Sequence, residues 1–283
     1  MDKLAPLADA VAVVQDGMRI GLTGFAITRN NVAVAHSLIR AGRRDLTVSQ
    51  VVGGLETDLL AAGGCLRRVE YSGGSLDRFG QLFALNRAIG AGAIEVVEYS
   101  SLALTLRLHA GALGLPFVPT RSMLGSDLLA PVLDDGAARM GEDPFAGGPV
   151  AVLAPLRPDV VFVHADVADA HGNASVSGPT WALRETAYAG REVVVVCEEL
   201  VPVGSIDPNR VVLAGAVVDM VAVVPHGAHP TAVQGRYDYD RVHLDAYAAL
   251  GRAGDDAHAD YLSRYVHGVG GFDEYLSLVG SDS

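Results

Sequence analysis

The fold is decided by the stretch IEVVEYSSLALTLRLHAGALGLPFVPTRSMLGSD, residues 94–127. It opens with a short apolar run, residues 94–98, that predicts a strand, and a polar turn follows at residues 99–101. The stretch continues as a helix, in which leucines recur at roughly helical spacing: Leu102, Leu106, Leu108 and Leu113. Gly114 ends this helix and Pro116 prevents it from continuing.

A strand, a polar turn and a helix in this order are how α/β proteins place a ligand at the carboxyl end of a parallel strand. Here the turn carries two neighbouring hydroxyl side chains, Ser100 and Ser101. These hydroxyls would face the ligand together with the free N–H groups at the start of the helix. We therefore take Ser100 and Ser101 as candidate ligand-contacting residues.

Three glycine-containing turns earlier in the chain each follow a predicted strand and precede a predicted helix. The strands span residues 18–22, 46–52 and 66–71, and the turns contain Gly24-Phe25, Gly53-Gly54 and Gly73-Gly74. This alternation predicts an α/β fold with a mostly parallel sheet covered by helices. Glycine lets a backbone approach a ligand closely, so we expect Gly24, Phe25, Gly73 and Gly74 at a binding site. A tight turn needed only for packing explains the first of these turns equally well.

The second half of the chain is expected to complete the same single domain, residues 1–283. Its most apolar run, residues 193–197, predicts a central strand, and residues 180–189 predict a helix that contains the only tryptophan, Trp181. Residues 134–149 are rich in glycine and proline and predict a long loop excursion. From about residue 268 to residue 283 we expect a C-terminal tail with a short helix and a frayed end.

The composition restricts the classes of function. With 21 Lys and Arg against 33 Asp and Glu, the formal net charge is −12, which argues against nucleic-acid binding because phosphate neutralisation dominates that affinity. Lys3 is the only lysine, so a Schiff-base mechanism is not expected. Two cysteines lack metal-ligand spacing, no signal-peptide pattern is visible, and no apolar run reaches the ~20 residues of a membrane helix. These features predict a cytoplasmic protein that does not enter a membrane.

Several polar clusters could carry chemistry, and the sequence leaves their roles open. Glu198 and Glu199 follow an apolar strand, where they could act as an acid and a base, or could cap a helix and pair with an arginine. His226 and His229 are spaced like metal ligands, but prolines on both sides preclude a regular helix, so no metal site is predicted. A hairpin turn is expected to scatter a further set of polar residues: His164, Asp166, Asp169 and His171.

Motifs spread over nearly the whole chain form one set. They are E-Y-S-S, L-R-L-x-A-G-A-L-G-L-P-F and P-T-R-S-x-L-G-S-D within residues 98–127, V-F-V-H-A-D-V-A-D-x-x-G-N-A at residues 161–174, and P-H-G-A-H-P at residues 225–230. This set resembles the α subunits of family I coenzyme A transferases, in particular the glutaconate CoA-transferase branch. The resemblance implies the fold of that family, an open Rossmann-like α/β sandwich.

The resemblance also implies a division of labour between two subunits. In family I enzymes a glutamate attacks an acyl-CoA thioester, and in two-subunit members this glutamate belongs to the β subunit. The chain would then be the α subunit of an α2β2 heterotetramer that moves CoA from an acyl-CoA to a carboxylic acid. It would carry no nucleophile and no permanently bound cofactor, and a CoA thioester would be its substrate. Ser100 and Ser101 would form the wall of the active site near the oxyanion.

Two further features bear on the substrate. Arg29, Asn30 and Asn31, after the first glycine turn, are candidate contacts for an acyl carboxylate, or else belong to a solvated loop. A branch of the family thought to hydrolyse CoA-linked steroid-ring fragments carries a glutamate just after the strand ending at Glu98, where this chain has Ser101. This difference favours a transferase but leaves the substrate open. The first hypothesis is therefore a transferase subunit that acts on a 3-oxo or dicarboxylic acyl group. The ring-opening hydrolase and a non-enzymatic small-ligand sensor are the alternatives.

Overall fold

A computed structural model describes residues 2–280 of the chain. Its main element is an eight-stranded sheet, whose strands are β1 (Arg19–Leu22), β2 (Leu46–Ser49), β3 (Leu66–Tyr71), β4 (Glu95–Glu98), β8 (Val160–Asp169), β9 (Ala174–Ser175), β10 (Glu192–Val201) and β11 (Met220–Val223). Parallel pairing gives the order β11-β10-β8-β1-β2-β3-β4, and β9 pairs antiparallel with β8. The predicted mostly parallel sheet is confirmed.

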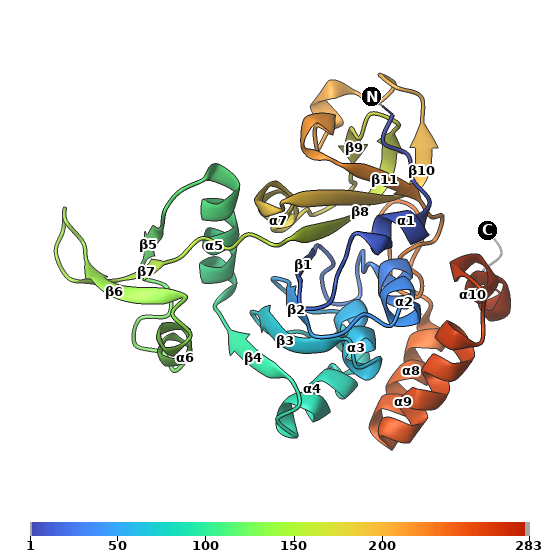
Figure 1. Cartoon of the computed structure of the whole chain (residues 1–283), viewed down its shortest axis with the longest axis horizontal. Helices are drawn as coiled ribbons and strands as arrows, with labels where there is room; N and C mark the ends of the chain where they lie inside the picture. Colours follow the sequence, from blue (N-terminus) through green and yellow to red (C-terminus); the bar gives the residue numbers. More distant parts are fainter. Residues whose placement is uncertain (1, 281–283) are drawn as a thin grey trace.

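Helices connect most of the strands and cover the sheet (Figure 1). They are α1 (Leu7–Ala12), α2 (Val32–Arg40), α3 (Leu55–Ala62), α4 (Phe83–Gly90), α5 (Ser101–Leu113), α6 (Leu129–Asp134) and α7 (Leu183–Ala189). The helices α8 (Arg241–Ala253), α9 (Asp255–Leu262) and α10 (Phe272–Val279) follow the last strand and pack against α4, α3 and α2 respectively. Among the described residues, none of the helices is long and apolar enough to cross a membrane.

Neighbouring residues of β8 alternate between two buried apolar cores. Val160 and Phe162 belong to the core that contains α2 and α3, whereas Val161 and Val163 belong to the core that contains Leu183 of α7. Side chains of a strand point alternately to opposite faces, so a strand covered on both faces needs apolar residues at successive positions. The continuous apolar runs of β8 and β10 follow from this arrangement.

The stretch of residues 94–127 forms the predicted strand, turn and helix. β4 ends at Glu98, and Ser100 caps α5 by accepting a hydrogen bond from the N–H of Ala103 at 3.1 Å. At the other end of α5, Gly114 adopts the left-handed conformation with a φ of 69°, which glycine tolerates without steric cost.

Residues 134–149 do not form the predicted long loop. They contain β6 (Ala138–Glu142) and lead into β7 (Pro149–Leu153), and the two strands pair antiparallel. With β5 (Val118–Thr120) they make a separate three-stranded sheet in the order β5-β7-β6, which projects to one side of the main sheet in Figure 1. The glycines and prolines that suggested a loop gather in the hairpin connection, residues 143–148, and most of β6 faces solvent, so it lacks an apolar pattern.

Two other predictions need correction. β10 is longer than residues 193–197 and lies next to the edge strand β11, so it is internal but not central. Trp181 is not in a helix, because α7 begins only at Leu183. In the C-terminal tail, α10 ends at Val279 with Gly280 as its left-handed cap, and the predicted frayed end, residues 281–283, lies outside the described residues.

The strand order places a crevice at one point of the main sheet. The order runs from β1 towards β4 on one side and from β8 towards β11 on the other, so the connections leave β1 and β8 in opposite directions. In open α/β sheets the crevice at the carboxyl ends of two such strands is where ligands bind. The carboxyl ends of β1 and β8 therefore mark the centre of the candidate site.

Candidate active site at the carboxyl edge of the sheet

The turn after β1 is held by buried polar contacts. A Cβ atom added to Gly24 would lie 2.3 Å from Oε1 of Glu56 and 2.6 Å from Nδ2 of Asn30, so only glycine fits there. Gln50 donates hydrogen bonds from Nε2 to the carbonyl of Gly24 at 2.9 Å and to Oε1 of Glu56 at 2.6 Å. The glycine predicted for ligand approach is thus also required by packing, and the next residue, Phe25, remains half-exposed at the crevice.

Glu56 is fully buried in the first turn of α3, beneath the β1 turn. Burial raises the pKa of its carboxyl to about 8. The hydrogen bond from Gln50 lowers this pKa, but by less than burial raises it. The side chain is therefore protonated at neutral pH and supports the turn as a neutral acid. Sequence reasoning missed both Glu56 and Gln50; the only signal was a glutamate at the start of a helix directly after Gly53-Gly54.

The ends of β2, β3 and β4 are joined by hydroxyl groups. Ser72 donates a hydrogen bond to the carbonyl of Val51 at 2.5 Å, and its Oγ lies 2.8 Å from Oγ of Ser101. Ser101 is exposed at the first turn of α5, so its hydroxyl and the neighbouring helix N–H groups can meet a ligand. In contrast to Ser101, Ser100 uses its hydroxyl within the protein. Its Oγ accepts the capping hydrogen bond from the N–H of Ala103 and lies 2.6 Å from Oγ of Ser122.

The glycines after β3 bring two turns together. The N–H of Gly53 donates to the carbonyl of Gly73 at 2.9 Å, and a Cβ on Gly74 would lie 2.8 Å from the carbonyl oxygen of Gly53. Gly73 has a φ of 101° and is half-exposed, which leaves its backbone open to a ligand. Glu98, an exposed carboxylate at the end of β4, lies close by and was not singled out from the sequence.

The burial of Arg29, Asn30 and Asn31 contradicts the prediction that they contact an acyl carboxylate. Their exposed fractions are 2%, 0% and 1%. Arg29 forms a buried ion pair with Asp166 of β8 and donates to the carbonyl of Ser177, while Oδ1 of Asn30 accepts a hydrogen bond from the N–H of Leu55 at 2.7 Å. Arg29 and Asn30 fix the loop after β1 to its neighbours, and none of the three side chains reaches the surface.

An aromatic pair spans the crevice between the β1 side and the β8 side. The rings of Phe25 and Trp181 stack with their centroids 4.3 Å apart and their planes at 10°. Trp181 is 41% exposed and its φ is 40°, a backbone conformation that the expected helix would not allow. Sequence reasoning placed Phe25 at the site but gave no sign that a tryptophan more than a hundred residues away would cover it.

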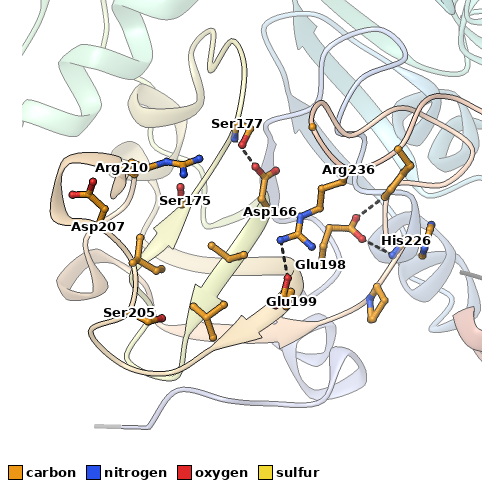
Figure 2. A pocket seen from close by; sticks show the side chains of 16 residues that line it. Asp166, Ser175, Ser177, Glu198, Glu199, Ser205, Asp207, Arg210, His226 and Arg236 are labelled. Carbon is orange, nitrogen blue, oxygen red and sulfur yellow. Dashed lines mark hydrogen bonds and ion pairs between the residues drawn. The ribbon is translucent and has the colours of Figure 1, made fainter.

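On the other side of the crevice, a polar cavity of about 760 Å³ opens above β8 and β10 (Figure 2). Glu198 reaches into it from within β10, not from the strand end that the sequence suggested. The carboxylate accepts hydrogen bonds from the Tyr237 hydroxyl at 2.6 Å and the His226 N–H at 2.5 Å, and Nε2 of His164 lies 2.8 Å away. Burial opposes ionisation, but these partners outweigh it and lower the pKa of Glu198, so it is a fixed anion.

The two candidate carboxylates and the two candidate histidines have separate roles. Glu199 forms an ion pair with Arg236 at 3.0 Å, at the more exposed side of the cavity. His226 stacks on Tyr237 with centroids 4.7 Å apart, whereas His229 lies elsewhere and contacts Asp240 at 3.2 Å. Within residues 2–280 no group of three His, Cys, Asp or Glu side chains could hold a metal ion.

The predicted scattering of the β8 polar residues is confirmed. Asp166 lines the cavity, and His164 is fully buried beside Glu198. Asp169 instead caps the hairpin turn by accepting hydrogen bonds from the N–H groups of His171 and Asn173 at 3.0 Å each. These side chains therefore do not form one catalytic set.

The fold and this edge define an α/β protein with a candidate ligand site where the glycine turns and the strand ends meet. The coenzyme A transferase family model matches residues 5–223. The chain is 33% identical over 283 residues to the A-subunit of 3-oxoadipate CoA-transferase from Pseudomonas knackmussii, covering 99% of both chains. The crystal structure of glutaconate coenzyme A-transferase from Acidaminococcus fermentans superimposes with a TM-score of 0.91 and 28% identity, covering 98% of this chain and 93% of that one.

Two other relatives are similarly close in sequence, but one is named as a hydrolase and the other is longer than this chain. The cholesterol ring-cleaving hydrolase IpdA subunit of Mycobacterium tuberculosis is 34% identical over 262 residues, with 87% of each chain covered. An uncharacterised protein of Archaeoglobus fulgidus is 34% identical, and this chain, matched over 99% of its length, spans 62% of the length of that relative. The chain belongs to the coenzyme A transferase family. It corresponds to the α chain of a heteromeric enzyme, as the resemblance implied, because it matches the Pseudomonas A-subunit end to end.

Proposed function

We propose that this chain, as the α subunit of a heteromeric coenzyme A transferase, forms one wall of an active site that a β subunit completes. The observation that carries the proposal is the carboxyl edge of β1 to β4, where open backbone turns, the Ser72–Ser101 hydroxyl pair and the start of α5 face one crevice. Such groups can hold a thioester and the oxyanion that develops on its carbonyl. One well-placed oxyanion donor contributes about 3 kcal/mol of transition-state stabilisation.

The reaction divides into two exchanges at a glutamate of the partner subunit. The glutamate carboxylate attacks the thioester carbonyl, the C–S bond breaks, and an acyl–glutamyl anhydride and the CoA thiolate result. The thiolate then attacks the glutamyl carbonyl, which releases the first carboxylic acid and leaves a glutamyl-CoA thioester. The second acid takes up CoA by the reverse of these steps. The residues of this chain position the acyl group and stabilise the oxyanions.

The substrate class we propose is a 3-oxo or dicarboxylic acyl group. It is supported by the likeness to the Pseudomonas relative, a 3-oxoadipate CoA-transferase, and by the polar side chains that line the neighbouring cavity above β8 and β10. No cofactor is expected to stay bound, because the thioester itself supplies the energy for transfer.

A second candidate function is hydrolysis of a CoA-linked ring fragment, which the 34% identity to the ring-cleaving hydrolase subunit favours. Against it stands Ser101, a hydroxyl at the position where the hydrolase branch was expected to carry a glutamate. The test is to incubate the complex with an acyl-CoA and an isotopically labelled acid. Labelled acyl-CoA supports the transferase, whereas free CoA that accumulates without labelled acyl-CoA supports the hydrolase.

For the assembly, we propose an α2β2 heterotetramer located in the cytoplasm. Large apolar side chains are exposed on the projecting sheet and beside it. The exposed fractions include 98% for Phe145, 61% for Leu113 and 53% for Phe117. Such a surface is typical of one that a partner subunit buries. Native mass spectrometry of the purified complex should give two copies of each chain. A monodisperse monomer of this chain alone at micromolar concentration would argue against the assembly.

A further inference from the structure

The cavity above β8 and β10 contains an unpaired cation and unpaired hydroxyl groups. Within the described part of the chain, the guanidinium of Arg210 has no ion pair or hydrogen bond, although Arg210 lines the cavity. The hydroxyls of Ser175, Ser177 and Ser205 line the same cavity and also have no hydrogen-bond partner among residues 2–280. In Figure 2 the Arg210 side chain extends towards Ser175, whereas the Asp207 side chain is directed away.

Three of the four carboxylates that line the cavity are bound by groups other than Arg210, and the fourth, Asp207, accepts hydrogen bonds from Asn209 and is directed away from Arg210 (Figure 2). Asp166 is paired with the buried Arg29 and accepts a hydrogen bond from the N–H of Ser177 at 2.6 Å. Glu199 is paired with Arg236. Glu198 is bound by Tyr237, by the His226 N–H and by His164. The unsatisfied groups beside Arg210 are therefore hydrogen-bond donors next to a positive charge, which is the chemistry that recognises an oxyanion.

The cavity shares a wall with the catalytic crevice. Arg29 donates to the carbonyl of Ser177, and a Cβ on Gly178 would lie 2.1 Å from Oε1 of Gln234, so residues 177–178 are clamped between the β1 loop and the loop after β11. Three residues further along, Trp181 stacks on Phe25 at the crevice. Residues 177–181 therefore connect the cavity to the aromatic pair at the proposed crevice.

We propose that this cavity binds an oxyanion of the substrate, with Arg210 as the charged anchor and Ser175 and Ser177 as hydroxyl donors. The inference rests on the proposed function, since the oxyanion is either the carboxylate of a dicarboxylic acyl group remote from the thioester or a phosphate of coenzyme A. Its role is to select and position the substrate, because the anchor lies outside the crevice where the thioester reacts.

The test compares the native complex with its Arg210→Gln variant, and uses Arg191→Gln as the matched control. Arg191 is an exposed arginine at the opposite, amino end of β10 and does not line the cavity. Transfer kinetics are measured with glutarate and with butyrate as acceptor acids. In parallel, binding of glutarate to the full chain is followed by calorimetry, a readout that does not depend on turnover.

Loss of a charge-assisted contact should raise KM for glutarate about tenfold to a hundredfold in Arg210→Gln, with KM for butyrate unchanged and with partial recovery in Arg210→Lys. An equal rise in KM for the acyl-CoA with both acids would also support the proposal and assign the site to a phosphate. Unchanged KM values for all substrates, with unchanged glutarate binding, would overturn it. If the complex shows no transfer but binds glutarate in an Arg210-dependent way, the proposed function fails and the anion site stands.

Discussion

The two halves of the carboxyl edge of the sheet differ in the types of residue that line them. The half formed by β1 to β4 consists mainly of glycine turns and hydroxyls. Its ionisable side chains include Glu56, which is buried as a neutral acid, and Glu98, an exposed carboxylate at the end of β4. The half formed by β8 to β11 consists of charged side chains arranged in pairs around a cavity, such as Arg29 with Asp166 and Glu199 with Arg236.

This difference indicates a division of tasks. A surface of backbone and hydroxyl groups can lie against a thioester and a partner subunit without adding a competing charge, whereas a cavity with fixed charges can discriminate between substrates. Arg29 connects the halves, because it starts from the β1 loop and pairs with Asp166 of β8. Variants that remove single contacts from each half test this division.

The largest effect is expected from Arg29→Met. The substitution leaves Asp166 buried without its cation, which should cost about 3–5 kcal/mol of unfolding free energy and displace the β1 loop. The measurement is urea unfolding of the purified chain. Arg236→Met, which breaks a more exposed pair with Glu199, is the control and should cost less than about 1 kcal/mol. Similar costs for the two variants would show that burial does not distinguish these pairs.

Gly24→Ala tests whether the β1 turn is fixed by packing. The added methyl group would overlap Glu56 and Asn30, so we expect a loss of about 1–3 kcal/mol and a strong loss of transfer activity. Gly90→Ala is the matched control, because a Cβ there meets no atom within 4 Å. Thermal unfolding and transfer rates should separate the two variants. Equal behaviour would mean that the turn relaxes without consequence.

Glu56→Gln tests the neutral state of the buried acid. The folded chain keeps this proton up to about pH 8, while the unfolded chain releases it near the ordinary pKa of 4.5, so its contribution to stability is full below pH 4.5 and falls as pH rises towards 8. Burial lowers the pKa of His36 to about 3 and of His243 and His258 to about 4, and it also lowers the pKa of His229. These histidines produce an opposite slope that extends to about one pH unit above their ordinary value of 6.5. Asp58, with a pKa raised to about 6, acts below that pH.

The window from about pH 7.5 to about pH 8.5 therefore isolates Glu56. Unfolding free energy of the native chain should decrease with pH across this window, and Glu56→Gln should flatten the slope, since glutamine cannot ionise. Denaturant titrations at several pH values give both slopes. An unchanged slope in the variant would show that Glu56 is already ionised in the folded chain.

The smallest effects on stability are expected at the neighbouring serines Ser100 and Ser101. Substitution of Ser100 should affect mainly stability, and substitution of Ser101 should affect mainly the transfer rate. Ser100→Ala removes the cap of α5 and should cost about 1 kcal/mol. Ser101→Ala removes an exposed hydroxyl, so stability should change by less than about 0.5 kcal/mol while the transfer rate falls. Unfolding curves and rates for both variants test this separation. A rate loss confined to Ser100→Ala would show that Ser100, and not Ser101, contacts the reacting group.

The sequence was sufficient for the parallel sheet because its signals are local. Apolar runs such as residues 160–163, and glycine turns after strands, determine strands, connections and the edge where ligands bind. The helix start at Ser100 and its end at Gly114 were predictable for the same reason, since caps depend on one or two residues.

The site was less predictable because its contacts join distant segments. The partners of Arg29 and Phe25 are Asp166 and Trp181, which no local pattern connects to them. Burial also reversed an inference: a polar run after a glycine turn, with Arg29 and Asn30 in it, usually indicates a solvated or ligand-binding loop, but here it satisfies buried groups of neighbouring loops. In β6, exposure on a projecting sheet removed the apolar alternation that identifies a strand.

The most direct test of the account is to find which chain carries the covalent intermediate. The complex, purified with its partner subunit, is incubated with an acyl-CoA, treated with borohydride, and both chains are digested for mass spectrometry. The account predicts a CoA adduct, or its reduction product, on one glutamate of the partner and none on this chain. An adduct on this chain, for which the exposed Glu98 beside Gly73 is the nearest candidate, would contradict the division of catalysis between the two subunits.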